Sequence, residues 1–153
     1  MENTNCPVNT TFIREVAVRY TGPPRRAESI RSPHTAAALM RRIVQDDARE
    51  HFVAIYLDGR HHPVAHQVVS IGTATASLVH PREVFQPAVL VGATAIIVGH
   101  NHPSGDPSPS QEDREVTRRL SRAGEVLGIR LVDHVVWTRD SRIFSFHEAD
   151  ELA

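Results

Sequence analysis

The 153-residue sequence contains no lysine, because all 17 of its Lys-or-Arg positions are arginine. This absence excludes catalysis through a lysine Schiff base. A single cysteine, Cys6, cannot form a disulfide within one chain, which favours a reducing compartment such as the cytoplasm. No apolar run approaches the roughly 20 residues of a membrane-spanning helix, and the first residues lack the basic-then-apolar form of a signal peptide. We therefore expect a cytoplasmic protein without a membrane segment.

The composition is that of an ordinary globular domain. Apolar residues make up 41% and charged residues 23% of the chain, and the formal net charge is −1. This charge gives no electrostatic reason to expect binding to DNA or to a membrane. At this length we expect one main domain over residues 28–147, with an N-terminal strand and loop over residues 1–27 packed on it and an acidic tail at 148–153.

Apolar periodicity and turn residues predict an α/β fold, a mixed sheet with helices packed against it. The Asp58-Gly59 turn indicates that the strands on either side of it are antiparallel. Ile30 is a candidate for a further short strand, and residues 73–79 for a loop. The predicted strands are residues 12–21, 52–57, 64–72, 93–99, 129–138 and 142–146, and the predicted helices are residues 33–49, 80–91 and 110–127.

The chemistry of the sequence is concentrated in residues 100–113, which join a buried strand to a long charged helix. Successive strand residues point to opposite faces, so His100 and His102 project to the same side. Proline and glycine restrict the loop that follows. Ser110 is a good N-cap, and Asp113 stands in the first helical turn, where the helix dipole favours an ionised carboxylate.

Two imidazoles and a carboxylate form a set of three candidate metal ligands. Zinc takes about four ligands, so one position is left for water, which is the pattern of a catalytic site. Taken separately, each half of the motif has a simpler interpretation. Paired histidines at a strand end are usually loop residues, and Ser-x-x-Asp is usually a capping box. The ordered combination of strand, His-x-His-Pro, rigid loop and capped aspartate favours the metal site.

This combination, His100-x-His102-Pro103 followed by Ser110-x-x-Asp113, resembles the JAMM (MPN+, JAB) metalloprotease motif. The sequence of residues 100–107 is similar to that of the RadC-like branch, and so are His-Pro-Arg-Glu at 80–83 and Leu-Val-Asp-His at 131–134. The resemblance extends over roughly residues 30–147. It implies the JAB/MPN fold, akin to the three-layer arrangement of cytidine deaminases, and a zinc ion held by the two histidines and the aspartate.

Hydrolysis by a metal-activated water needs a group that accepts a proton and returns it to the leaving amine. In JAMM proteins this group is a glutamate just before a central strand, and the resemblance assigns it to Glu50. Glu83 is the competing candidate. Ser110 is expected both to cap its helix and to donate a hydrogen bond to a developing oxyanion. Asp106 is a candidate fourth ligand but is more simply a turn residue.

Other polar and aromatic residues receive structural interpretations. Asn101 should point opposite to the two histidines. His134 is expected to be buried with a structural hydrogen bond, and Trp137 to belong to the core. The pair at residues 61–62 lies in a turn and should be solvated, and His80 is a candidate helix cap.

The leading hypothesis is a zinc-dependent metallopeptidase acting on a peptide or isopeptide bond, with a protein or peptide such as a ubiquitin-like tail as substrate. A DNA repair-associated role, suggested by the label on RadC-like proteins, is an alternative, although nothing here resembles the helix-hairpin-helix segment of longer members. A non-catalytic MPN interaction module is a further alternative. Deamination would require thiolate ligands, and Cys6 is far from the motif in sequence.

Overall fold

The computed structural model describes residues 15–17, 19–24, 26–72 and 79–152. A five-stranded sheet lies at its centre, with strand order β2-β1-β3-β4-β5. β3 and β4 are parallel, and the other neighbours are antiparallel. The prediction of a mixed sheet flanked by helices is confirmed. The strands are β1 (Glu50–Leu57), β2 (Pro63–Gly72), β3 (Ala95–Asn101), β4 (Arg130–Trp137) and β5 (Ile143–Ser145).

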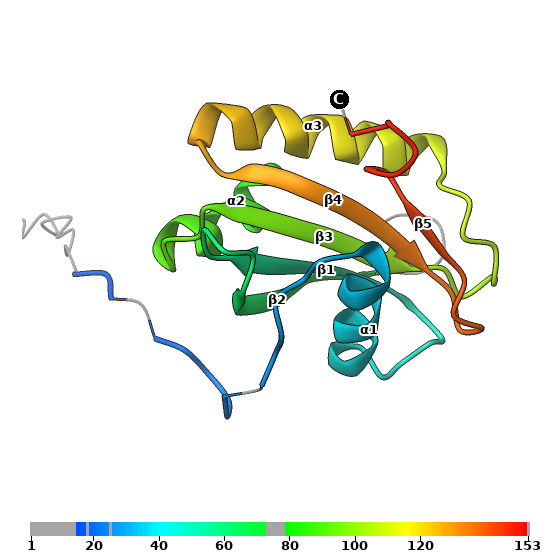
Figure 1. Ribbon diagram of the computed structural model, residues 1–153, viewed down its shortest axis with the longest axis horizontal. Helices are drawn as coiled ribbons and strands as arrows, with labels where there is room; N and C mark the ends of the chain where they lie inside the picture. The colour runs from blue at the N-terminus through cyan, green and yellow to red at the C-terminus, as the bar shows by residue number, and fades with distance from the viewer. Residues whose placement is uncertain (1–14, 18, 25, 73–78, 153) are drawn as a thin grey trace, which may run out of the picture.

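Helices cover both faces of the sheet (Figure 1). Helix α1 (Pro33–Ile43) packs on one face, and helices α2 (Pro81–Leu90) and α3 (Gln111–Leu127) pack on the other. β1 is buried on both faces, as its nearly continuous apolar sequence predicts. Its alternate residues are divided between the two cores: Phe52, Ala54 and Tyr56 face α2 and α3, and Val53, Ile55 and Leu57 face α1.

The parallel pair β3–β4 is the feature that positions the site. Parallel strands need a long crossover connection, and here the crossover is the loop after β3 followed by α3. The end of β3 and the start of α3 are therefore adjacent in the chain and in space. Ser110 caps α3, and Gly128 ends it in the left-handed conformation with φ 68°, both as predicted.

The first predicted helix is shorter than the sequence indicates. Ser32 caps α1 and Pro33 occupies its first turn as expected, but the helix ends at Ile43 instead of residue 49. The reason is local competition for hydrogen bonds: the Asp46 carboxylate accepts from the Ala48 backbone amide at 2.9 Å and from the Arg49 side chain, which forms a turn.

The N-terminal prediction is also corrected. Residues 15–17 and 19–21 carry no strand; residues 12–14 and 18, which belong to the same predicted strand, lie outside the described residues. Ile30 forms no strand either. It is buried, and its backbone amide donates to the His61 carbonyl at 3.0 Å. Of the predicted loop 73–79, only Val79 is described, and it is buried.

Candidate metal centre

The two histidines of the motif lie at the carboxyl end of β3, on the face covered by α3. β3 runs to Asn101, so His100 is inside the strand and not after it as the sequence analysis expected. His100 is paired with Phe52 across the antiparallel β1–β3 ladder. The two rings are stacked with centroids 5.9 Å apart, and His100 is completely buried. The sheet core thereby holds one imidazole rigidly at the base of the site.

The structure brings the three candidate ligands together. The Nε2 atoms of His100 and His102 are 3.0 Å apart. Asp113 places its Oδ1 3.2 Å from Nε2 of His100 and its Oδ2 3.6 Å from Nε2 of His102. One donor atom from each residue lies within 4.8 Å of the others. A tetrahedral zinc ion with bonds near 2.0–2.1 Å separates its ligand atoms by about 3.3 Å, so these distances fit a shared ion.

The second nitrogen of each ring is already engaged. His100 Nδ1 lies 2.9 Å from His134 Nε2, and His102 Nδ1 lies 2.7 Å from the backbone carbonyl of Asp106. A carbonyl only accepts, so His102 donates through Nδ1, and in the neutral ring Nε2 is the atom left to bind an ion. The two Nε2 atoms face one another beside the Asp113 carboxylate, an arrangement that suits a cation between them. A hydrogen-bond partner on the other ring nitrogen, here Nδ1, is typical of metal-binding histidines.

Asp113 is prepared to act as an anionic ligand. Burial of its carboxyl opposes ionisation, but hydrogen bonds to His100 and His102 and the charge of His100 outweigh it, and hold the pKa well below its usual range. The Ser110 backbone amide also donates to Oδ2 at 2.7 Å, while the Ser110 hydroxyl accepts from the Asp113 amide at 3.1 Å. This capping box fixes the carboxylate toward the histidines.

The exposed side of the site is formed by His102 and Asp113, whose side chains each keep 15% of their surface accessible. The hydrogen bond from His102 to Asp113 raises the pKa of His102, against the effect of burial. The Asp106 carbonyl and the charge of Glu50 act in the same direction. A position facing solvent is therefore available beside the three candidate ligands.

Glu50 begins β1 on the same face as the histidines. In the β1–β3 ladder, Phe52 is opposite His100. Glu50 precedes Phe52 by two residues, so its side chain is on the same face of β1 as Phe52. Glu50 is half-buried and its charge acts on the imidazole of His102. The structure thus places this residue at the edge of the site.

The competing candidate Glu83 is distant from the ligands along the sheet. It is exposed in the first turn of α2. That turn lies over the other end of β1, because the Tyr56 hydroxyl donates to the Val84 carbonyl at 3.0 Å. Tyr56 is four residues along β1 from Phe52, the residue opposite His100. The structure therefore favours Glu50 over Glu83 as the carboxylate beside the ligands.

Other predicted residues have clear positions. The exposed Asp106 carboxylate accepts from the Ser108 amide at 2.9 Å, as a turn residue does, so its contribution to the site is its backbone carbonyl. Asn101 binds the β1 backbone and points away from the ligands, and Trp137 is buried in the core as expected. His80 occupies the N-cap position of α2 without a side-chain capping bond.

His134 is the residue whose role the sequence analysis did not find. It is completely buried, as predicted, but its partner is the candidate ligand His100. Its Nδ1 lies 2.7 Å from the Thr117 hydroxyl of α3. Complete burial lowers the pKa of His134 well below its usual value. Only the fold reveals this contact, because the residues are 34 positions apart.

Comparison with known proteins agrees with this geometry. The family model of the RadC-like JAB domain matches residues 30–152. This chain belongs to the RadC-like JAB domain family. A UPF0758 protein of Trichlorobacter lovleyi is 46% identical over 125 residues, which are 82% of this chain and 54% of the relative.

Two further UPF0758 proteins show the same extent of similarity. That of Shouchella clausii is 49% identical over 107 residues, 70% of this chain and 46% of its own length. That of Methanosarcina acetivorans is 46% identical over 126 residues, 82% of this chain and 51% of its own length. The chain spans about half the length of the curated relatives it matches.

Among the described residues of this RadC-like JAB domain, none of the helices has both the length and the apolar character of a membrane-spanning segment.

Proposed function

We propose that this RadC-like JAB domain is a zinc-dependent hydrolase of the JAMM type that cleaves a peptide or isopeptide bond in a protein substrate. The observation that carries the proposal is the convergence of the Nε2 atoms of His100 and His102 and the Asp113 carboxylate on one point beside solvent. Imidazole and carboxylate donors in this number suit zinc and leave a position open. Zinc bound there supplies Lewis acidity that makes water nucleophilic near neutral pH.

The protein's own residues provide the remaining functions. Glu50, at the start of the neighbouring strand with its charge acting on His102, accepts the proton of the attacking water and returns it to the leaving amine. The Ser110 hydroxyl accepts the capping hydrogen bond through its oxygen, so its proton is available to donate to the oxyanion of the tetrahedral intermediate. The buried stack of His100 on Phe52 keeps the base of the site rigid.

The proposal is tested by metal analysis followed by an unbiased search for cleaved bonds. Wild type and Glu50→Gln are first measured for zinc per chain. Each is then incubated with a bacterial protein extract whose amines have been blocked, and new amines are identified by mass spectrometry. A new α-amine reports peptide hydrolysis, and a new lysine ε-amine reports isopeptide hydrolysis.

We expect both proteins to hold one zinc ion, and only the wild type to release amines. The His100→Ala, His102→Ala double variant should hold none. Stoichiometric zinc in that double variant, or equal amine release by zinc-loaded wild type and Glu50→Gln, would contradict the proposal. Zinc binding without any amine release would instead support the non-catalytic interaction module, and a steeply salt-dependent affinity for duplex DNA would support the DNA-associated alternative.

A further inference from the structure

A change of register in β4 brings His134 to the metal site. Ile96 of β3 is paired with Leu131, but the next residue, Ile97, is paired with Asp133, so Val132 is an extra residue in β4. Side chains alternate along a strand, and one extra residue reverses the face of every residue after it. Without this bulge, His134 would point to the α1 face, away from His100.

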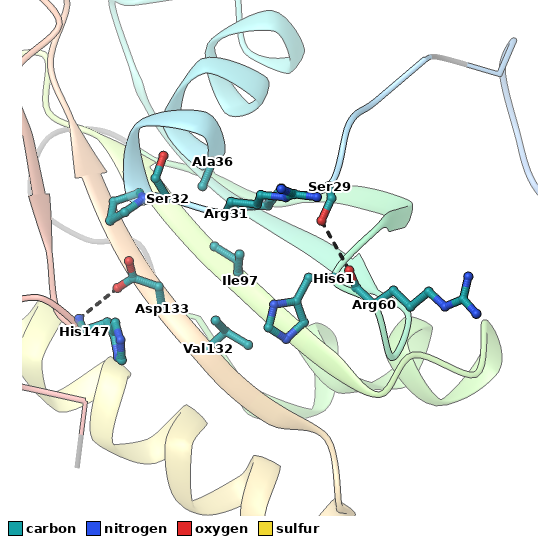
Figure 2. Close-up of a pocket in the computed structure, with 12 residues that line it drawn as sticks. Ser29, Arg31, Ser32, Ala36, Arg60, His61, Ile97, Val132, Asp133 and His147 are labelled. Atoms are coloured by element: carbon teal, nitrogen blue, oxygen red, sulfur yellow. Dashed lines mark hydrogen bonds between the residues drawn. The ribbon is translucent and has the colours of Figure 1, made fainter.

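The two faces of the sheet show the effect directly. Val132 and Asp133 are consecutive, yet both line one open cavity of about 420 Å³ on the α1 face (Figure 2). Leu131 and His134, on either side of them, point to the α3 face, where Leu131 joins the core and His134 contacts Thr117. The bulge therefore sets the orientation of the histidine.

Asp133 stabilises the bulged backbone. Its Oδ1 accepts from the backbone amides of His134 at 2.7 Å and His147 at 2.9 Å, and its Oδ2 accepts from the Ser145 hydroxyl at 2.7 Å. The contact with His147 is visible in Figure 2. Both carboxylate oxygens are thus used to hold β4, β5 and the segment after β5 in place, and the position of His134 follows from these bonds.

The hydrogen bonds around His134 have one consistent direction. The Thr117 hydroxyl donates to the Asp113 carbonyl at 2.7 Å, so its oxygen accepts from His134 Nδ1. His134 is completely buried between two phenylalanine rings and has no carboxylate among its hydrogen-bond partners, so the ring is uncharged. A neutral imidazole that donates through Nδ1 accepts through Nε2. His134 Nε2 therefore accepts from His100 Nδ1, so Nε2 of the neutral His100 ring is the atom left to bind an ion, and it is directed toward His102 and Asp113.

We propose that His134 and Thr117 are positioning residues for the metal centre, which fix His100 in the Nδ1-protonated form that presents Nε2 to the ion. The inference rests on the proposed function for the identity of the ion, but not for the hydrogen-bond order. The chain of bonds begins at the Asp113 backbone and ends at the ring of His100, so it connects two ligands through β4 and α3. Such partners of metal-binding histidines set the tautomer and the orientation of the ring.

A purely structural role for His134 is the interpretation that the experiment must separate. The ring is stacked on Phe146 with centroids 4.7 Å apart, and it forms a T-shaped contact with Phe52 with centroids 5.4 Å apart. Any side chain at position 134 that differs in shape from histidine would disturb this packing. The test therefore compares matched pairs of variants: His134→Leu with His134→Gln, whose amide can accept from one neighbour and donate to the other, and Thr117→Val with Thr117→Ser, which keeps the hydroxyl.

Two measurements are made on each protein, besides its thermal unfolding. In the zinc-free protein, ring ¹⁵N chemical shifts report the tautomer of His100, which is assigned with a His100→Gln variant. Zinc affinity is then measured by competition with a chromophoric chelator. We expect Thr117→Val and His134→Leu to lose the Nδ1-protonated preference of His100 and to bind zinc about 10–100-fold more weakly. Thr117→Ser and His134→Gln should remain within a few-fold of the wild type.

A folded Thr117→Val protein with the wild-type tautomer and wild-type zinc affinity would overturn the inference, even if His134→Leu failed to fold. The outcome is distinguishable from a failure of the proposed function. Variants that weaken zinc binding in a protein that releases no amines would leave the positioning role standing and reject the hydrolase. If the variants keep the wild-type His100 tautomer and zinc affinity while the wild type does release amines, the positioning role is rejected and the hydrolase stands.

Discussion

The Asn101 side chain accepts a hydrogen bond from the His51 backbone amide at 2.7 Å, and it donates to the Arg49 carbonyl at 2.8 Å. These two residues flank Glu50, so one amide on β3 holds the backbone on both sides of the proposed general base. Asn101 also lies between the two histidine ligands in sequence. The spacing of ligands and base therefore depends on a side chain that contacts neither.

Asn101→Ala should separate these functions. Removing the amide leaves the His51 amide and the Arg49 carbonyl without their partner, which should cost about 1–3 kcal/mol of unfolding free energy. Zinc content should stay near one per chain, because no ligand is touched, while amine release falls. Urea denaturation, metal analysis and the cleavage assay measure the three effects. Wild-type hydrolysis in a destabilised Asn101→Ala protein would show that Glu50 does not depend on this bridge.

Ser110 allows its capping and catalytic roles to be tested apart. Ser110→Ala should lose about 1 kcal/mol of stability because alanine is a poor N-cap, whereas Ser110→Gly should lose only a few tenths. If the hydroxyl donates to the oxyanion, both variants should lose hydrolysis by about 10²–10³-fold. Rates are compared at saturating zinc. If the hydrolysis rate instead follows the unfolding free energy, with Ser110→Gly near the wild type, Ser110 acts only as a helix cap.

Metal binding should stabilise the folded protein through linkage. At zinc concentrations about 100-fold above the dissociation constant, the unfolding free energy should rise by about 2.7 kcal/mol, and excess chelator should remove the gain. His102→Ala should abolish this response. Asp106→Asn is the matched control, because its carboxylate binds the Ser108 amide and only its backbone carbonyl meets His102. Loss of the zinc response in Asp106→Asn would make Asp106 a ligand after all.

Gly99, directly before His100, lies where no side chain fits. A Cβ there would stand 2.5 Å from both the Met40 sulfur of α1 and the Val135 carbonyl of β4. The methionine can move, but the strand carbonyl cannot without disturbing the parallel ladder. We expect Gly99→Ala to lose about 1–3 kcal/mol in urea denaturation. The control is Gly59→Ala, since a Cβ at Gly59 meets nothing within 4 Å; equal losses in both variants would contradict the packing argument.

Asp133 predicts a specific pH dependence. Burial raises its pKa above the ordinary value, although hydrogen bonds from Ser145, His147 and His134 oppose the shift. The unfolded chain therefore releases this proton at lower pH than the folded one. The contribution of Asp133 to stability is complete below its unfolded pKa of about 3.9 and is lost as pH rises through the folded value. Asp133→Asn carries no such proton.

The stability of Asp133→Asn relative to wild type should therefore increase as pH rises from about 4 toward neutrality. Urea denaturation of both proteins over a pH series measures the difference. A difference that is constant over this range would show that Asp133 titrates alike in the folded and unfolded chain. The comparison cancels the other carboxylates, which both proteins share.

The candidate metal site could be predicted from the sequence because its determinants are local. His100 and His102 share a face through the period of a strand, and Asp113 takes its place from the helix that Ser110 caps. The α/β class and the antiparallel β1–β2 pair follow from similar short-range patterns. The end of α1 was missed because Asp46 competes for backbone hydrogen bonds within a segment that has no apolar periodicity.

What only the tertiary structure decided are the contacts between distant segments. The one-residue bulge at Val132 turns His134 toward His100. No sequence pattern within β4 predicts the bulge, because a bulge is defined only by the pairing of β4 with β3. The bridge from Asn101 to the start of β1 joins residues about 50 positions apart. By itself the sequence determined which side chains are candidates for binding a metal ion. The register between neighbouring strands determined which residues hold those side chains in place, since register is a property of two segments and not of one.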